Sequence, residues 1–183
     1  MNLKIILGGA ILAGFIFMTK KAIGSETDIF SDKYDEFFRR SAMNNRIKPE
    51  ALKAIAANES MVGKFKGLEP IGGTTGIMHI KLETARMFNK SLTAQELLDP
   101  KIEIEYGAKY FRWLLDRYAK FPEPRRSQLA VIGYNGGPGR ADQIAKNGEQ
   151  PYLNDSWYKN VQTYLARYTS HVQKLGGSQN AIA

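Results

Sequence analysis

Glu59 is the residue of this sequence whose type and position best suit acid–base chemistry. It comes near the end of residues 49–60, a segment that begins with proline and contains no helix breaker, so we predict a single helix there. Leu52, Ile55 and Ala56 share one face of this helix, and Glu59 is the next position on the same face. A carboxylate therefore ends an otherwise apolar stripe.

The expected surroundings of Glu59 favour a general acid. Partial burial and the negative end of the helix dipole both disfavour the ionised carboxylate, so this side chain should hold its proton more readily than an exposed glutamate. A carboxylic acid that is still protonated near neutral pH can protonate a leaving group. The helix alone leaves another interpretation open, in which Glu59 bends into solvent or pairs with a lysine, because charged residues are rarely buried.

Length and charge limit the kinds of protein that this chain can be. Its 183 residues suffice for one domain with a substantial core. The formal net charge is +8, of which residues 1–24 supply +3, and the modest surplus of the remainder suits an anionic polymer such as cell wall. The sequence has no dense Lys/Arg run with interleaved aromatic residues, so we do not expect a nucleic-acid partner.

The residue types also bear on cofactors. The chain has no cysteine, which excludes a disulfide framework and a thiolate metal site. No cluster of His, Asp and Glu has the spacing of a metal site in the sequence. We therefore expect neither a metal nor another cofactor.

Residues 1–24 form a hydrophobic N-terminal segment. Within it, residues 5–18 are uncharged and apolar, and at ~1.5 Å per residue they would span ~21 Å as a helix, less than the ~30 Å hydrocarbon core of a bilayer. This length matches a secretory signal, but Lys20 and Lys21 stand where a small, neutral cleavage site would be. Because flanking lysines can snorkel, we favour an uncleaved membrane anchor, with a cleaved signal as the alternative.

The rest of the chain reads as one helical domain. Residues 25–33 are expected to be a polar linker, 34–175 the domain and 176–183 a loose tail. Residues 61–75 are rich in glycine and predict a loop, and a short strand is possible near 77–80. Thr93 and Glu96 have the spacing of a capping box. The expected helices are 34–43, 49–60, 83–88, 100–118, 126–134, 140–146 and 155–175.

Several motifs downstream of Glu59 occur in series. Glu59 is followed by Ser60, residues 73–80 read GTTGIMHI, residues 134–139 read YNGGPG, and Tyr164 precedes a leucine. This series resembles the soluble lytic transglycosylase family, whose members carry Glu-Ser at a helix end, Gly-Ala-x-Gly-Leu-Met-Gln-Ile, Tyr-Asn-Ala-Gly-Pro-Gly and a late Tyr-Val. The resemblance covers about residues 34–170.

The resemblance implies a lysozyme-like helical fold and an enzyme that cleaves the glycan strands of peptidoglycan. It implies that Glu59 is the catalytic acid at the MurNAc–GlcNAc β-1,4 bond, with the N-acetyl group of the substrate stabilising C1. Glu59 would then act as base on the muramyl 6-hydroxyl, so that a 1,6-anhydro ring closes without water. The substrate-binding residues that it implies are Ser60, Met78, His79, Tyr134, Asn135 and Tyr164.

Two positions depart from the family pattern. His79 stands where the family has a substrate-contacting Gln, and Glu103 stands where the long helix usually has Asn. The first departure concerns substrate contacts, whereas the second is interpreted as local packing or capping.

Two other functions are carried as alternatives. One is a goose-type-lysozyme-like hydrolase on the same scaffold, which would need a second acid or a positioned water. The other is a membrane-tethered wall-binding module with an impaired site, which an intact Glu59 disfavours. A small anchored enzyme of this kind fits a phage virion that opens the wall for genome entry, and equally a secretion or conjugation machine.

Overall fold

The structure of the chain, a computed structural model, describes residues 31–60 and 76–183. The regular structure within these ranges is helical. The described residues also include one isolated antiparallel β-bridge, between Ile47 and Ile182. The all-α expectation is confirmed for this part of the chain. The elements are α1 (Asp35–Asn44), α2 (Pro49–Ser60), α3 (Leu82–Ala85), α4 (Ala94–Leu97), α5 (Pro100–Arg117), α6 (Arg125–Gly136), α7 (Pro138–Asn147), the 3₁₀ turn η4 (Gln150–Tyr152) and α8 (Ser156–Lys174).

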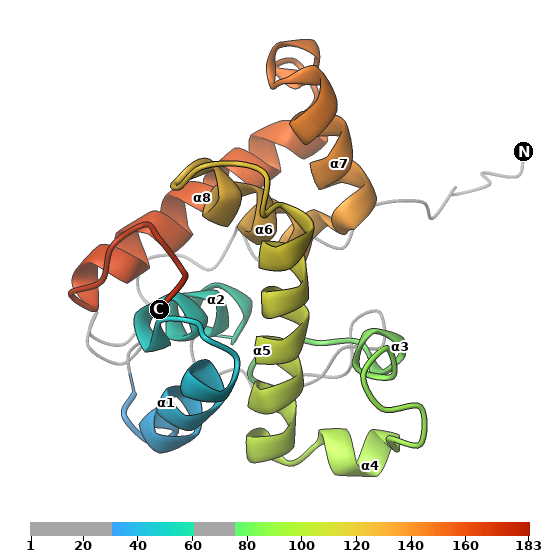
Figure 1. Ribbon diagram of the computed structural model, residues 1–183, viewed down its shortest axis with the longest axis vertical. Coiled ribbons are helices and arrows are strands. Elements are labelled where there is room, and N and C mark those ends of the chain that lie inside the picture. The colour runs from blue at the N-terminus through green and yellow to red at the C-terminus, as the bar shows by residue number, and fades with distance from the viewer. Residues whose placement is uncertain (1–30, 61–75) are drawn as a thin grey trace, which may run out of the picture.

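The long helix α5 lies at the centre of the fold and packs against four other helices. Asp99 caps it by accepting a hydrogen bond from the Lys101 N–H, and Pro100 lies in its first turn, which agrees with the predicted start at residue 100. In Figure 1, α5 runs through the middle of the molecule, with α1 and α2 on one side and α3 and α4 on the other. It contacts α1, α3, α4 and α6 directly. Its fully buried face consists of Ile104, Ala108, Phe111, Leu114 and Leu115.

Helix α2, which carries Glu59, is enclosed on nearly all sides. Residues 51–57 are all buried, and the helix packs against α1 and α8. Even Lys53 is largely buried, with its ammonium group 2.5 Å from an oxygen of Asp35 on α1. A helix that is buried around most of its circumference belongs to the core. The last turn of α2 is therefore held firmly.

The C-terminal residues pack on the domain, in contrast to the loose tail that the sequence suggests. Ala181 is fully buried, and its N–H donates to the hydroxyl of Ser127 on α6 at 2.9 Å. Its carbonyl accepts from the N–H of Lys48 at 2.8 Å, and Ile182 makes the bridge to Ile47. These backbone contacts join the end of the chain to the start of α2.

Most predicted helix boundaries agree with the structure to within a few residues, and the capping box of Thr93 and Glu96 is present at α4. Two local expectations were wrong. Residues 77–80 form bends and irregular chain instead of a short strand. Helix α6 continues to Gly136 instead of ending at 134, so that Asn135 lies in its last turn, and the next residue is Gly137, whose φ of +85° favours glycine.

Several predictions concern residues outside the described ranges. These are the hydrophobic segment 1–24, most of the linker 25–33, the loop 61–75 and the first three residues of the 73–80 motif. In the ranges 31–60 and 76–183, no helix combines the length and the apolar character needed to cross a membrane.

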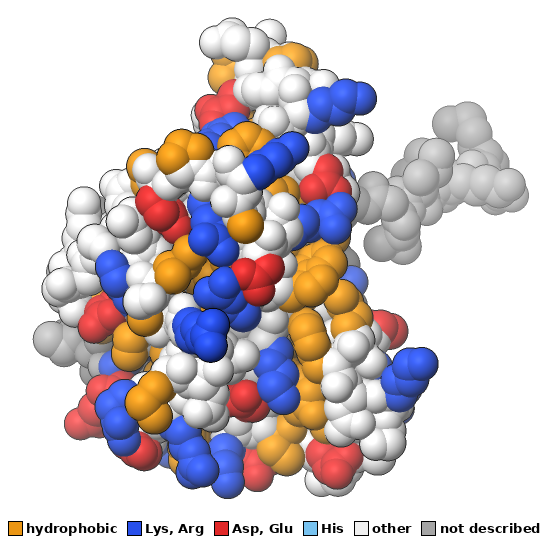
Figure 2. Space-filling model, in the orientation of Figure 1, with side chains coloured by type: hydrophobic (Ala, Val, Ile, Leu, Met, Phe, Trp, Pro, Cys, Tyr) orange, Lys and Arg blue, Asp and Glu red, His pale blue; other side chains and the backbone are white. Residues whose placement is uncertain are grey.

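Charged side chains of both signs share the surface. Figure 2 shows Lys and Arg side chains lying beside Asp and Glu over one face of the molecule. Asp116 pairs with both Arg112 and Arg126, and Arg117 pairs with Asp142 across α5 and α7. Such exposed pairs contribute little to stability each, but they place negative charges directly beside positive ones.

Candidate active site

Glu59 has a different neighbour at each of its carboxylate oxygens. Its side chain is 17% exposed and lies in the last turn of α2, next to α8. Oε1 accepts a hydrogen bond of 2.6 Å from the Tyr164 hydroxyl. Oε2 lies 3.5 Å from Nδ1 of His79. Tyr164 thus occupies Oε1 as a donor, which leaves Oε2 as the oxygen that carries the proton when Glu59 is a carboxylic acid.

Tyr164 is a firmly placed donor. It is 2% exposed, and burial together with the negative charge of Glu59 raises its pKa well above the ordinary value. The hydroxyl is therefore protonated throughout the neutral range. The side-chain amide of Asn58 donates to the backbone carbonyl of Tyr164 at 3.0 Å, so that the residue preceding Glu59 ties α2 to α8 at the level of this contact.

The segment 76–80 is fixed opposite Glu59 by side chains from three helices. Ser60 of α2 donates its hydroxyl to the Ile77 carbonyl at 2.6 Å, and Tyr134 of α6 donates to the Met78 carbonyl at 3.1 Å. Glu103 of α5 accepts from the N–H groups of both Ile77 and Met78. This segment therefore has little freedom, although it contains neither helix nor strand.

Tyr134 links this segment to the aromatic core. Its ring packs against Tyr110 at 5.3 Å and against Phe111 at 6.2 Å between centroids. Burial raises its pKa well above the ordinary value, and the nearby carboxylates of Glu59 and Glu103 act in the same direction. Its hydroxyl consequently stays a donor, and that donor is engaged with the Met78 carbonyl.

The structure brings four of the predicted site residues around Glu59 as neighbours or supports, and it separates their roles. His79 and Tyr164 face the carboxylate directly. Ser60 is 1% exposed and its hydroxyl is used within the fold, so it supports the 76–80 segment. Tyr134 does the same from α6.

The side chains of Met78 and Asn135, the other two predicted site residues, make no hydrogen bond to Glu59 or to the 76–80 segment within the described part of the chain. Met78 is fully buried and packs on α5, where a Cβ at Gly107 would lie 2.9 Å from its side chain. This position makes Met78 a core residue instead of the substrate-binding residue that the resemblance implies. Asn135 is partly exposed at the end of α6, and its side chain can contact a ligand only from that helix end.

Glu103 is the site residue whose role sequence reasoning missed. From the sequence, Glu103 was interpreted as a residue of local packing or capping. In the structure it is a buried carboxylate that accepts hydrogen bonds from the 76–80 segment. A signal was present in the sequence: Glu103 stands one turn before Gly107 and two turns before Tyr110, both on the buried side of α5. An acid on the core face of a helix indicates a specific partner.

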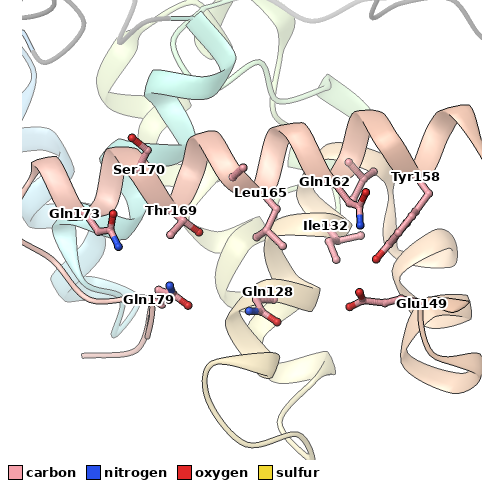
Figure 3. A pocket seen from close by; sticks show the side chains of 12 residues that line it. Gln128, Ile132, Glu149, Tyr158, Gln162, Leu165, Thr169, Ser170, Gln173 and Gln179 are labelled. Carbon is pink, nitrogen blue, oxygen red and sulfur yellow. The ribbon is translucent and has the colours of Figure 1, made fainter. Parts of the chain in front are cut away.

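The sequence predicts a cleft between the Glu59 helix, the glycine-rich loop 61–75 and the turn at Tyr134, but that loop lies outside the described residues. A different surface groove, of about 430 Å³, runs between α6, α8 and the C-terminal residues. Gln128, Leu165 and Gln179 are among its lining side chains (Figure 3). It contains none of the predicted site residues. Within the ranges that the structure describes, no three His, Asp or Glu side chains come together as a metal site would require.

Comparisons with known proteins found a matching family, related sequences and similar folds. The model of the Transglycosylase SLT domain family matches residues 36–156. A membrane-bound lytic murein transglycosylase F of Pseudomonas fluorescens Pf-5 is 31% identical over 136 residues, which are 74% of this chain and 27% of that protein. The chain thus spans about a quarter of the length of the curated relatives that it matches.

Two solved structures are similar in fold. One is an inactive mutant of the lytic transglycosylase Slt from Pseudomonas aeruginosa, with a TM-score of 0.61 and 25% identity, covering 84% of this chain and 26% of that one. The other is the 70 kDa soluble lytic transglycosylase of Escherichia coli, with a TM-score of 0.61 and 24% identity, covering 82% and 25%.

Proposed function

The chain belongs to the Transglycosylase SLT domain family, and we propose on this premise that it is a peptidoglycan lytic transglycosylase. Its substrate is the glycan strand, and the bond cleaved is the β-1,4 bond between MurNAc and GlcNAc. The observation that carries the proposal is the setting of Glu59, a largely enclosed carboxylate with a tyrosine donor on one oxygen and a histidine facing the other.

Glu59 acts first as acid and then as base. Its proton passes from Oε2 to the glycosidic oxygen, the C1–O bond breaks, and GlcNAc leaves with a free 4-hydroxyl. The N-acetyl oxygen of the muramyl sugar stabilises C1 while Glu59 is a carboxylate. Glu59 then removes the proton of the muramyl 6-hydroxyl as O6 bonds to C1, which regenerates the acid and consumes no water.

Tyr164 assists the step in which Glu59 becomes an anion. Its hydroxyl donates to Oε1, and a hydrogen bond to a charged acceptor is stronger than one to a neutral acceptor. The bond therefore strengthens as the proton leaves Oε2. The Tyr164 hydroxyl therefore stabilises the carboxylate that forms during the reaction without occupying the oxygen that delivers the proton.

A mechanism with one carboxylate is favoured over the two-carboxylate mechanism of most glycosidases. Glu103 is near, but it is 1% exposed and both of its oxygens accept backbone N–H groups. It is therefore not available as a nucleophile or as a base for water. The goose-type hydrolase alternative would require water to be activated by Glu59 itself on the opposite face of the sugar.

Product analysis tests this function. Purified peptidoglycan digested in ¹⁸O-water should yield muropeptides that end in 1,6-anhydro-MurNAc, lighter than reducing ends by one water and free of ¹⁸O. Reducing ends carrying ¹⁸O as the main product would instead establish hydrolysis. A wall-binding module with an impaired site would release no product on zymography.

The setting of the enzyme is proposed from the sequence. Residues 1–24 would anchor the chain in the membrane with the catalytic domain facing the wall, where local cleavage serves a virion or a secretion or conjugation machine. Detergent-dependent extraction of the full chain, with Met1 or Asn2 at its N-terminus, is the expected result. A mature chain that begins at Ser25 would show a cleaved signal instead.

A further inference from the structure

Glu103 is a buried carboxylate that takes no part in the proposed chemistry, although it binds the backbone beside the site. It lies on α5, and its two oxygens accept hydrogen bonds from consecutive N–H groups, Oε2 from Ile77 at 2.5 Å and Oε1 from Met78 at 2.9 Å. An ionised carboxylate is purely an acceptor, so it satisfies both donors at once. Charge-assisted bonds of this kind are short and strong.

Gly76 belongs to the same contact. Its φ is +93°, and a Cβ at this position would lie 2.0 Å from Oε2 of Glu103. A side chain is therefore incompatible with both the backbone conformation and the approach of the carboxylate. The sequence supplies a glycine and a glutamate at the two positions that this contact requires.

His79 directly follows the residues that Glu103 holds. Its φ is +47°, a left-handed conformation that is uncommon for residues other than glycine and persists only where the surrounding structure imposes it. The contacts of Glu103 on the amides of Ile77 and Met78 are well placed to impose it. In this conformation Nδ1 of His79 lies 3.5 Å from Oε2 of Glu59.

We propose that Glu103 is a positioning residue, which accepts hydrogen bonds from the backbone of Ile77 and Met78 and thereby holds His79 facing Oε2 of Glu59. The inference rests on the proposed function, because the placement of His79 affects rate only if Glu59 delivers the proton. With glutamine in place of Glu103, the amide oxygen could accept a hydrogen bond from one of the two N–H groups, but the NH₂ group would face the other N–H, and two donors form no hydrogen bond. Both negative oxygens are therefore needed.

The first test reads the position of His79 without any substrate. The chain has two histidines, so the imidazole signals in a ¹H–¹³C NMR spectrum of the full chain are assigned by His79→Gln. Glu103→Gln should shift the signals of His79 and leave those of His171, which lies on α8, in place. Unchanged His79 signals in folded Glu103→Gln would overturn the proposal.

A matched control lies on the same helix. Glu105 is partly buried and contacts Asn45 at 3.4 Å and Lys109 at 3.8 Å, and residues two apart on a helix face different directions. Glu105→Gln should therefore leave both histidine signals where they are. Equal shifts of His79 in the two variants would point to a general effect on α5 and contradict the specific role of Glu103.

The second test measures cleavage of soluble glycan strands by the same variants. Glu103→Gln should lower kcat roughly ten- to a hundred-fold with little change in KM, because misplacement of a group beside the reacting atoms has effects of this size. In a His79→Gln background, the same substitution should cost much less. An equal loss in both backgrounds would show that Glu103 does not act through His79.

Hydrogen exchange on the unmodified chain covers the case in which Glu103→Gln fails to fold. The amides of Ile77 and Met78 should exchange slowly although their segment is neither helix nor strand. Fast exchange of both amides would show that the hydrogen bonds to Glu103 do not hold this segment. Because the NMR and exchange results do not depend on activity, failure of the proposed enzyme function would appear separately, as absence of cleavage by a chain whose His79 is placed as described.

Discussion

At the scale of single residues, the two oxygens of Glu59 have separate tasks, and the partner of each can be changed alone. Oε1 receives the Tyr164 hydroxyl, whereas Oε2 faces His79 and is the oxygen that donates in the proposed mechanism. A residue that touches Oε1 should affect how well the anion is stabilised. A residue near Oε2 should affect how the proton is held and delivered.

Tyr164→Phe should lower kcat by about ten-fold or more, since a hydrogen bond to a charged group contributes roughly 1.5–3 kcal/mol. Initial rates on soluble glycan strands measure this. Tyr168→Phe is the control, because Tyr168 is equally buried one turn along α8 and its hydroxyl has no hydrogen-bond partner among the described residues. If both variants lose the same activity, the Tyr164–Glu59 bond has no special part in the reaction.

The backbone of His79 gives a stability prediction that is independent of its imidazole. His79→Gly and His79→Ala both remove the ring, but only glycine adopts a φ of +47° without steric cost. His79→Gly should therefore be the more stable of the two by about 1 kcal/mol, as measured by chemical denaturation. A more stable alanine variant would show that the left-handed conformation at this position is not maintained in solution.

The sequence singled out Glu59 more clearly than it indicated the roles of the residues around it. An acid at the end of an apolar helical stripe was a candidate from spacing, the series of motifs downstream favoured it over a solvent-facing or lysine-paired glutamate, and the resemblance placed Tyr164 at the same site. Ser60 and Met78 belong to the same motifs, yet the fold buries both. Whether a motif residue faces the ligand or the core depends on three helices meeting, which local spacing does not encode.

At the level of secondary-structure elements, the ends of helices could be predicted where the sequence contains recognisable capping residues or helix breakers. Asp99 and Pro100 define the start of α5, and Thr93 with Glu96 defines α4. The segment 76–80 was harder because its conformation is set by Glu103, Ser60 and Tyr134 from distant parts of the chain. The C-terminal residues were missed for the same reason, since their partners are long-range backbone contacts.

Ser127→Ala tests how firmly the end of the chain is attached. The Ser127 hydroxyl accepts the N–H of the fully buried Ala181, and a buried donor left without its partner costs roughly 1–3 kcal/mol. The free energy of unfolding should fall by that amount. Ser178→Ala, at an exposed serine of the same tail that contacts Lys48, should change it by less than about 0.5 kcal/mol. Equal effects would mean that the tail is not docked on α6.

At the scale of the whole molecule, buried tyrosines make stability depend on alkaline pH. Burial raises the pKa of Tyr158 to about 12 and also raises those of Tyr118 and Tyr168. Unfolded tyrosines ionise near pH ~10, so above this pH the unfolded state releases protons that the native state keeps. The stabilising contribution is complete below about pH 10 and is lost as pH rises toward the native pKa values.

The free energy of unfolding should therefore decline steeply above about pH 10, by up to ~1.4 kcal/mol per pH unit for each such tyrosine. Denaturant titrations at a series of alkaline pH values measure the slope. Tyr168→Phe should reduce this slope by the contribution of one tyrosine. A curve that stays flat for a full pH unit above that point would contradict the burial of these hydroxyls.

The most direct test of the central claim compares the wild-type chain with Glu59→Gln on purified peptidoglycan. The substitution keeps the size of the side chain but removes the proton that it delivers, and general acid–base catalysis typically contributes ~10²–10⁴-fold. We predict a loss of at least about a hundred-fold in the release of 1,6-anhydro-muropeptides, measured by mass spectrometry, with an unchanged melting temperature. A folded Glu59→Gln variant that keeps more than about a tenth of the wild-type rate would show that Glu59 is not the essential acid.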